Sequence, residues 1–124
     1  MTTHTDTRPT AADQINAAGA LLALLTTHSG LPAPRVTSEC VVTGERDVSG
    51  TLLLTWGLTL AFHRDSALAA FEQWRQALGV DPAVVDHETT GTLAWLDATT
   101  TYAGTPIRLV GYFTLPEAAT GEER

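Results

Sequence analysis

In one stretch of the sequence, residues 51–62, large apolar side chains occupy every second position, and the positions between them carry smaller side chains except at Leu53. The large side chains at every second position are Leu52, Leu54, Trp56, Leu58, Leu60 and Phe62. An α-helix would distribute these residues around its circumference, whereas a β-strand places all of them on one face. The stretch therefore predicts a strand with one face in the core, and such a strand needs a sheet around it and a layer that covers it.

A helix is predicted before this strand, between residues 10 and 29. Thr10 is a suitable N-cap, and Asp13 three positions later completes an acidic capping box. Gly30 ends the helix, and the prolines at positions 32 and 34 prevent its continuation. The helix is expected to bury one apolar stripe, which comprises Ile15, Ala18, Leu22 and Leu25 and is widened by Leu21 and Leu24.

Another strand and a second helix flank the alternating stretch. The β-branched residues 35–43 predict a strand, and the charged loop at residues 44–50 joins it to the strand at 51–62. The second helix runs from residue 65 or 66 to Leu78 and is closed by Gly79. Its expected buried stripe is Ala67, Ala70, Phe71, Trp74 and Leu78.

Two further strands are expected at residues 87–102 and 107–115, joined by a turn at residues 103–106. The elements therefore predict one α+β domain, residues 10–115, in the order α-β-β-α-β-β. A four-stranded antiparallel sheet with both helices on one face would bury every apolar stripe. The polar residues 1–9 and the acidic residues 116–124 are expected to be flexible tails.

The charge and composition of the chain exclude several classes of function. Acidic residues number 14 against 7 arginines, lysine is absent and the net charge is −7, so direct binding to nucleic acid is not expected. No G-x-G-x-x-G or P-loop sequence occurs, which excludes nucleotide sites of those kinds. The longest apolar run is too short to cross a bilayer, and residues 1–9 lack the pattern of a signal peptide. With a single cysteine, the chain is expected in the reducing cytoplasm.

Only fragments of catalytic or metal-binding motifs are present. His63 and Asp65 form half of a metal-binding pattern, and we expect them instead to end a strand and cap a helix. Cys40 would need His63 or His87 as a base to act as a nucleophile, and nothing around it would lower the pKa of its thiol. We expect Cys40 to be a small buried core residue. No catalytic residue, metal ligand or cofactor is therefore assigned.

Asp97 is the most unusual carboxylate, because aspartate is disfavoured in the middle of a strand. We expect it to pair with Arg108 across the last hairpin rather than to contact a ligand. Trp56 and Trp95 also lie on predicted strands. They would form an apolar patch if they emerged on the face of the sheet that the helices leave uncovered, although core packing is favoured for each.

Three stretches of the chain resemble a group of small actinobacterial proteins of unknown function. The stretches are HSGLPAP at residues 28–34, FEQWRQALG at residues 71–79 and TTTYAGTPIRLVGY at residues 99–112. They match the patterns HxGLPAP, FxxWRxALG and TTTYAGxPxRLxGY of that group, and the resemblance covers most of residues 11–115. It implies a stand-alone cytoplasmic protein and transfers no catalytic residue to this chain.

These observations favour a non-enzymatic protein-interaction module that forms a homodimer. Two helices can cover only one face of the predicted sheet, and the other face is expected to be apolar enough to associate. The residues expected at this interface are Leu53, Leu96, Arg108, Val110 and Tyr112. The alternative is a small-molecule binding domain or a minor enzyme with a pocket between the helices and the sheet.

Overall fold

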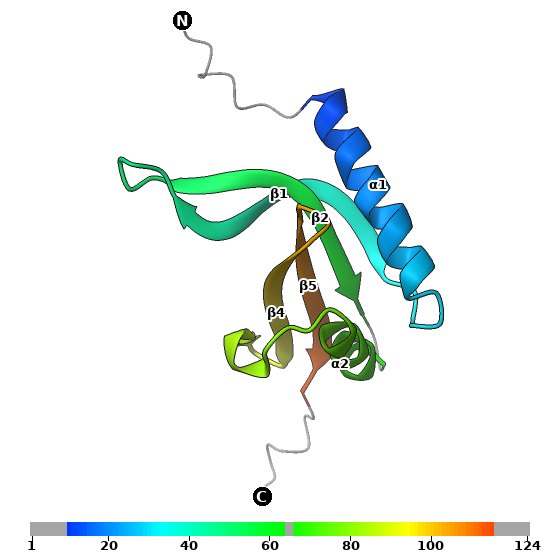
Figure 1. The fold of residues 1–124 in the computed structure, drawn as a ribbon. Helices are drawn as coiled ribbons and strands as arrows, with labels where there is room; N and C mark the ends of the chain where they lie inside the picture. The colour runs from blue at the N-terminus through cyan, green and yellow to red at the C-terminus, as the bar shows by residue number, and fades with distance from the viewer. Residues whose placement is uncertain (1–9, 64–65, 116–124) are drawn as a thin grey trace, which may run out of the picture.

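The computed structural model describes residues 10–63 and 66–115, so the tails predicted at 1–9 and 116–124 lie outside the described residues. Its elements in chain order are helix α1 (Ala11–Thr27), strands β1 (Arg35–Arg46) and β2 (Leu52–Phe62), helix α2 (Ala67–Ala77), a short 3-10 helix (Pro82–Val84), and strands β3 (Asp86–Thr90), β4 (Leu93–Tyr102) and β5 (Thr105–Thr114). In Figure 1, α1 runs along the outer side of the molecule and α2 lies beside the end of β5. The predicted α+β class is confirmed.

The sheet has five strands in the order β1-β2-β5-β4-β3. Strands β2 and β5 are parallel, and the other neighbours are antiparallel. The prediction of four antiparallel strands is therefore wrong in the number of strands and in the direction of the central pair. Residues 87–102, predicted as one strand, are the two strands β3 and β4, because the chain reverses at Gly91, whose φ is +63°.

The core lies between one face of the sheet and the two helices. The buried side chains of β2 and β5 on this face are Leu58, Leu60, Phe62, Ile107 and Leu109. Gly111 continues this face of β5, and a Cβ atom added to it would lie 3.1 Å from the Cβ atom of Phe71 on α2. The glycine therefore allows α2 to approach the sheet closely.

Helix α2 buries the stripe that its sequence predicts. Ala67, Ala70, Phe71 and Trp74 are buried, and Leu78 is half-buried. The indole Nε1 of Trp74 donates a hydrogen bond to the backbone carbonyl of Pro32 at 2.7 Å. This contact fixes the link between α1 and β1 against α2, which gives the HSGLPAP and FEQWRQALG stretches a structural role.

Helix α1 buries a different face from the one predicted. Its capping box is present, and the backbone N–H of Thr10 donates to the carboxylate of Asp13 at 2.8 Å. The predicted stripe is wrong for Ile15 and Leu22, which are each 70% exposed, and for the exposed Ala18. Leu24 is buried as predicted, and Leu21 and Leu25 pack against the core. The buried residues of α1 are Ala17, Ala20 and Leu24. Apolar residues lie on all sides of α1, so periodicity alone selects no face, and the small alanines allow the helix to approach the sheet.

Strand β2 separates from the centre of the sheet at Gly57. From Leu58 to Ala61 β2 pairs with both β1 and β5, whereas its earlier residues pair with β1 alone. A side chain at Gly57 would collide with the backbone carbonyl of Pro106 at the start of β5. The outer half of the β1–β2 hairpin consequently extends past the other strands as a two-stranded ribbon (Figure 1).

Replacing Gly57 by alanine should lower the free energy of unfolding by on the order of 1–3 kcal/mol, because β2 and β5 must move apart to accommodate the new methyl group. Urea denaturation of the two proteins measures this difference. The control is Gly30→Ala, since no atom lies within 4 Å of a Cβ added there. Equal stabilities for the two variants would contradict the close approach at Gly57.

Candidate functional site

Strands from both edges of the sheet line one hollow on the face opposite the helices. The hollow has a volume of about 350 Å³ and is lined by Cys40, Val41, Val42, Asp86, Asp97, Thr99 and Arg108. Because β1 and β3 are the outermost strands, the sheet must curl toward this face for both of them to reach one hollow. Val41 is accordingly only 2% exposed, although it lies on the face away from the helices.

A bidentate ion pair lies in this hollow, as the sequence predicts. The Nε atom of Arg108 donates to both carboxylate oxygens of Asp97, at 3.0 and 3.2 Å, and Nη2 donates to Oδ2 at 2.6 Å. The side chains of both residues are partly buried. The hydrogen bonds that the guanidinium of Arg108 donates to Asp97 raise the pKa of Arg108 above its ordinary value, so the guanidinium remains charged at any physiological pH.

Further carboxylates lie near the same arginine. The hydroxyl of Thr59, which is buried, donates a hydrogen bond to the carboxylate of Glu39. The negative charge of Glu39 also contributes to the raised pKa of Arg108. Asp86 lies directly opposite Asp97 in the β3–β4 pair. Carboxylates therefore outnumber the guanidinium in the hollow, whose local charge is negative.

The structure separates the five residues that were predicted to form an interface on this face. Leu96 is on the wrong face, since its side chain packs against the core, and along a strand an error of one residue moves a side chain to the opposite face. Val110 is on the predicted face but is fully buried. Arg108 is held by its ion pair, and Tyr112 is half-buried. The side chain of Leu53 lies outside the described part of the chain.

An aromatic row follows the end of the helix-free face. The rings of His63 and Tyr112 are stacked with their centroids 4.9 Å apart, and the Trp95 ring lies 6.4 Å from that of Tyr112. Trp56 is on the helix side and packs against the core, so the two strand tryptophans do not form one patch. His63 therefore has a packing partner, while its predicted companion Asp65 falls outside the described residues.

The remaining catalytic and metal-binding candidates are not assembled into a site. Cys40 is exposed, which corrects the prediction of a buried core residue, because β1 is an edge strand. His87 stacks on Phe113, with ring centroids 6.4 Å apart. Within residues 10–63 and 66–115, no group of three or more His, Cys, Asp or Glu side chains is placed to hold a metal ion. No helix in these ranges is long and apolar enough to cross a membrane.

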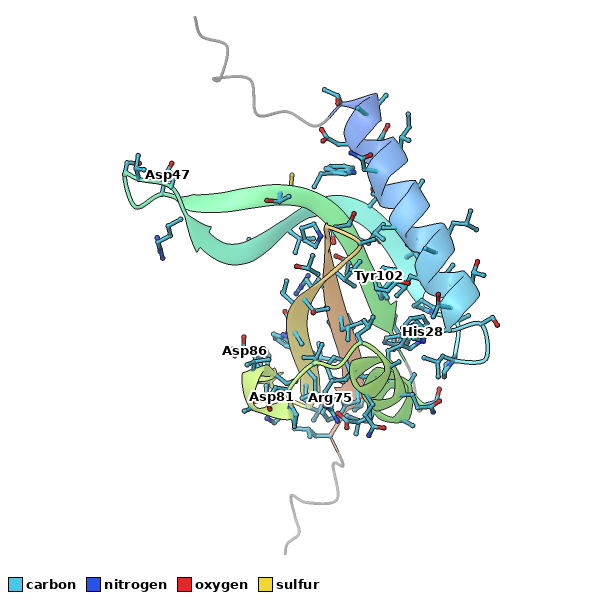
Figure 2. The ribbon with its side chains drawn as sticks, viewed as in Figure 1. His28, Asp47, Arg75, Asp81, Asp86 and Tyr102 are labelled. Carbon is cyan, nitrogen blue, oxygen red and sulfur yellow. The ribbon has the colours of Figure 1, made fainter. Side chains whose placement is uncertain are left out.

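The outer face of α1 is the surface that the sequence interpretation missed. Ile15 and Leu22 are the most exposed large apolar side chains of the described helices. Ala18 between them is also exposed. In Figure 2 this helix lies along one side of the molecule, with its outward side chains free of contact with the sheet. The signal was present in the sequence as an apolar stripe, but it was assigned to the core.

The ion pair in the hollow predicts a measurable coupling. Arg108→Met should lower the free energy of unfolding by about 1–3 kcal/mol, because it leaves the partly buried Asp97 carboxylate without its donor. A double-mutant cycle with Asp97→Asn should give a coupling energy of about 0.5–3 kcal/mol. The control is Asp86→Asn in the same hollow, where we expect a change within about 0.5 kcal/mol. Additive effects of the two pair variants would contradict the pairing.

The described residues therefore offer two surfaces of different chemistry. The hollow is polar and negatively charged, and its arginine is already satisfied by Asp97. The outer face of α1 is apolar and nearly uncharged, which suits protein contact rather than chemistry on a substrate. No family model, curated protein or solved structure matches this chain.

Proposed function

We propose that this protein is a non-enzymatic protein-interaction module that acts as a homodimer, with the outer face of α1 as its contact surface. The observation that supports the proposal is the exposure of Ile15 and Leu22, each 70%, on a helix whose only charged residue is Asp13. The two side chains lie on one helix face with the exposed Ala18 and Gly19 between them, and a contiguous apolar patch is a surface that another protein can cover. The one cysteine, an exposed thiol, suits the reducing cytoplasm.

The charge of the chain favours α1 as the place where two copies meet. The net charge is −7, so two copies repel each other over most of their surfaces. On α1 the one charge, Asp13, is near the N-terminal end and bound to the backbone of Thr10. The helix is thus the surface on which association encounters the least repulsion.

The helix-free face supports a dimer less well. Its apolar contribution was expected from Leu96 and Val110, but the first packs in the core and the second is fully buried. Among the side chains that the structure describes, this face exposes the polar rim of the hollow, Leu93, and parts of Trp95 and Tyr112. An interface core is normally depleted in charged residues, and this face is not.

The hollow supports a second candidate function, the binding of a small cation. Its volume of about 350 Å³ is at the lower end of the range for ligand sites, but its lining is polar instead of apolar. Asp86 and Asp97 line the hollow beside a single arginine, on which Glu39 also acts, so a guanidinium or ammonium group is the chemistry that the hollow suits. Calorimetric titration with agmatine, a small guanidinium compound, tests this candidate, and Asp86→Asn should weaken any binding.

Sedimentation equilibrium tests the proposed dimer. The wild type should be a dimer at micromolar concentrations, and Ile15→Glu should raise the dissociation constant at least about tenfold, or about 1.4 kcal/mol, because it places a charge in the contact. The residue is exposed, so the substitution should not unfold the monomer.

Two variants serve as controls for this experiment. Val84→Glu introduces the same charge at an exposed valine in the short 3-10 helix, away from α1, and should leave the dimer intact. Tyr112→Glu places it on the helix-free face and should have little effect. A wild-type protein that is monomeric throughout the micromolar range would overturn the proposal. If only Tyr112→Glu dissociated the dimer, the contact would lie on the helix-free face of the sheet instead of on α1.

A further inference from the structure

The exposed face of α1 has the residue spacing of a helix–helix seam. Five exposed residues form this seam, namely Ala12, Ile15, Gly19, Leu22 and Thr26. Successive residues of the seam are three, four, three and four positions apart. This alternation places them in one line along a helix, as in the a and d positions of a coiled coil. The buried residues Ala17, Ala20 and Leu24 lie on the opposite side of the helix.

Gly19 in the middle of this seam has no role in packing the described chain. A Cβ atom added there would have nothing within 4 Å. Glycine inside a helix lowers stability by about 1 kcal/mol relative to alanine, so this position makes the isolated helix less stable without any packing benefit inside the described protein. A glycine on an exposed helix face is suited to the close approach of another backbone.

We propose that two copies of the chain pack their α1 helices antiparallel, with the two-fold axis passing beside Gly19; this inference rests on the proposed homodimer. The seam is self-complementary about that glycine. Ile15 of one copy then lies against Leu22 of the other, Ala12 lies against Thr26, and the two Gly19 residues meet at the axis. The large side chains thereby flank the closest approach of the backbones, and each fills the space beside the other's glycine.

Electrostatics favour the antiparallel arrangement over a parallel one. Asp13 is the only charged residue of α1. Asp13 lies four residues before the buried Ala17, on the side of the helix away from the seam, so its carboxylate meets its counterpart in neither arrangement. The two helix dipoles, in contrast, attract each other in an antiparallel pair and repel each other in a parallel pair.

A second copy suits this seam better than a membrane surface does. Helices that lie on membranes present lysine or arginine beside their apolar face, and α1 has neither. A two-fold contact between identical helices, in contrast, requires residues of similar kind on both sides of the axis. The seam meets this requirement, because Ile15 and Leu22 flank Gly19.

Disulfide cross-linking determines the direction of the helices. In a Cys40→Ser background, Gly19→Cys should cross-link to itself under mild oxidation, because both copies of this position lie at the axis. Ala12→Cys and Thr26→Cys should each fail to cross-link alone and should cross-link to each other when the two proteins are mixed. Self-cross-linking of Ala12→Cys would show a parallel pair and overturn the inference.

The close approach at Gly19 is tested separately by Gly19→Leu. The monomer has room for this side chain and a leucine favours the helix, so the thermal stability of the monomer should not fall, while the dimer dissociation constant should rise at least about tenfold. The control is Asn16→Leu, an exposed residue of α1 outside the seam, which should leave the dimer intact.

The outcomes distinguish this inference from the proposed function. A wild-type dimer that Gly19→Leu does not weaken would overturn the antiparallel contact and leave the homodimer standing. A wild-type monomer in sedimentation equilibrium would overturn both. Loss of the dimer in Gly19→Leu, together with its retention in Asn16→Leu and the mixed cross-link between positions 12 and 26, would support both.

Discussion

The parallel pairing of β2 with β5 is the constraint on which the rest of the structure depends. In its register Leu58 lies beside Ile107 and Leu60 beside Leu109, so the buried side chains of both strands form one apolar surface under the helices. A glycine permits a close approach at each end of this pair. Gly57 accommodates the backbone at Pro106, and Gly111 accommodates Phe71 of α2. The position of α2, the curl of the sheet and the hollow on its other face follow from this packing.

Features with a local sequence signal could be predicted, and features that depend on docking could not. The alternation in β2, the α2 stripe, the Thr10–Asp13 capping box and the Asp97–Arg108 pair each involve residues close in sequence or related by one turn. The reversal at Gly91 was missed because a single glycine between threonines is a weak turn signal. The direction of β5 beside β2 is set by how a distant part of the chain docks, which no local pattern encodes.

The errors at the candidate sites have two physical causes. Leu96 was assigned to the wrong face of its strand, since its side chain packs on the core side. Cys40 was assigned to the core, but it lies on an edge strand and is exposed. For α1 the pattern itself was ambiguous, because a helix that is apolar all round has no preferred face. In the structure the alanines of α1 face the sheet, because small side chains allow the two layers to pack closest. Ile15 and Leu22 therefore lie on the outer side of the helix.

The outer face of α1 and the acidic hollow lie on opposite sides of the sheet, so one can be covered while the other stays open. Helix α1 packs on the apolar face of β2 and β5, whereas the hollow with Asp97 and Arg108 opens on the other face. Contact between two α1 helices therefore leaves the hollow of each copy uncovered. A dimer formed through α1 would thus present two identical acidic hollows, and a basic partner with two matching groups would bind it more tightly than a monomer.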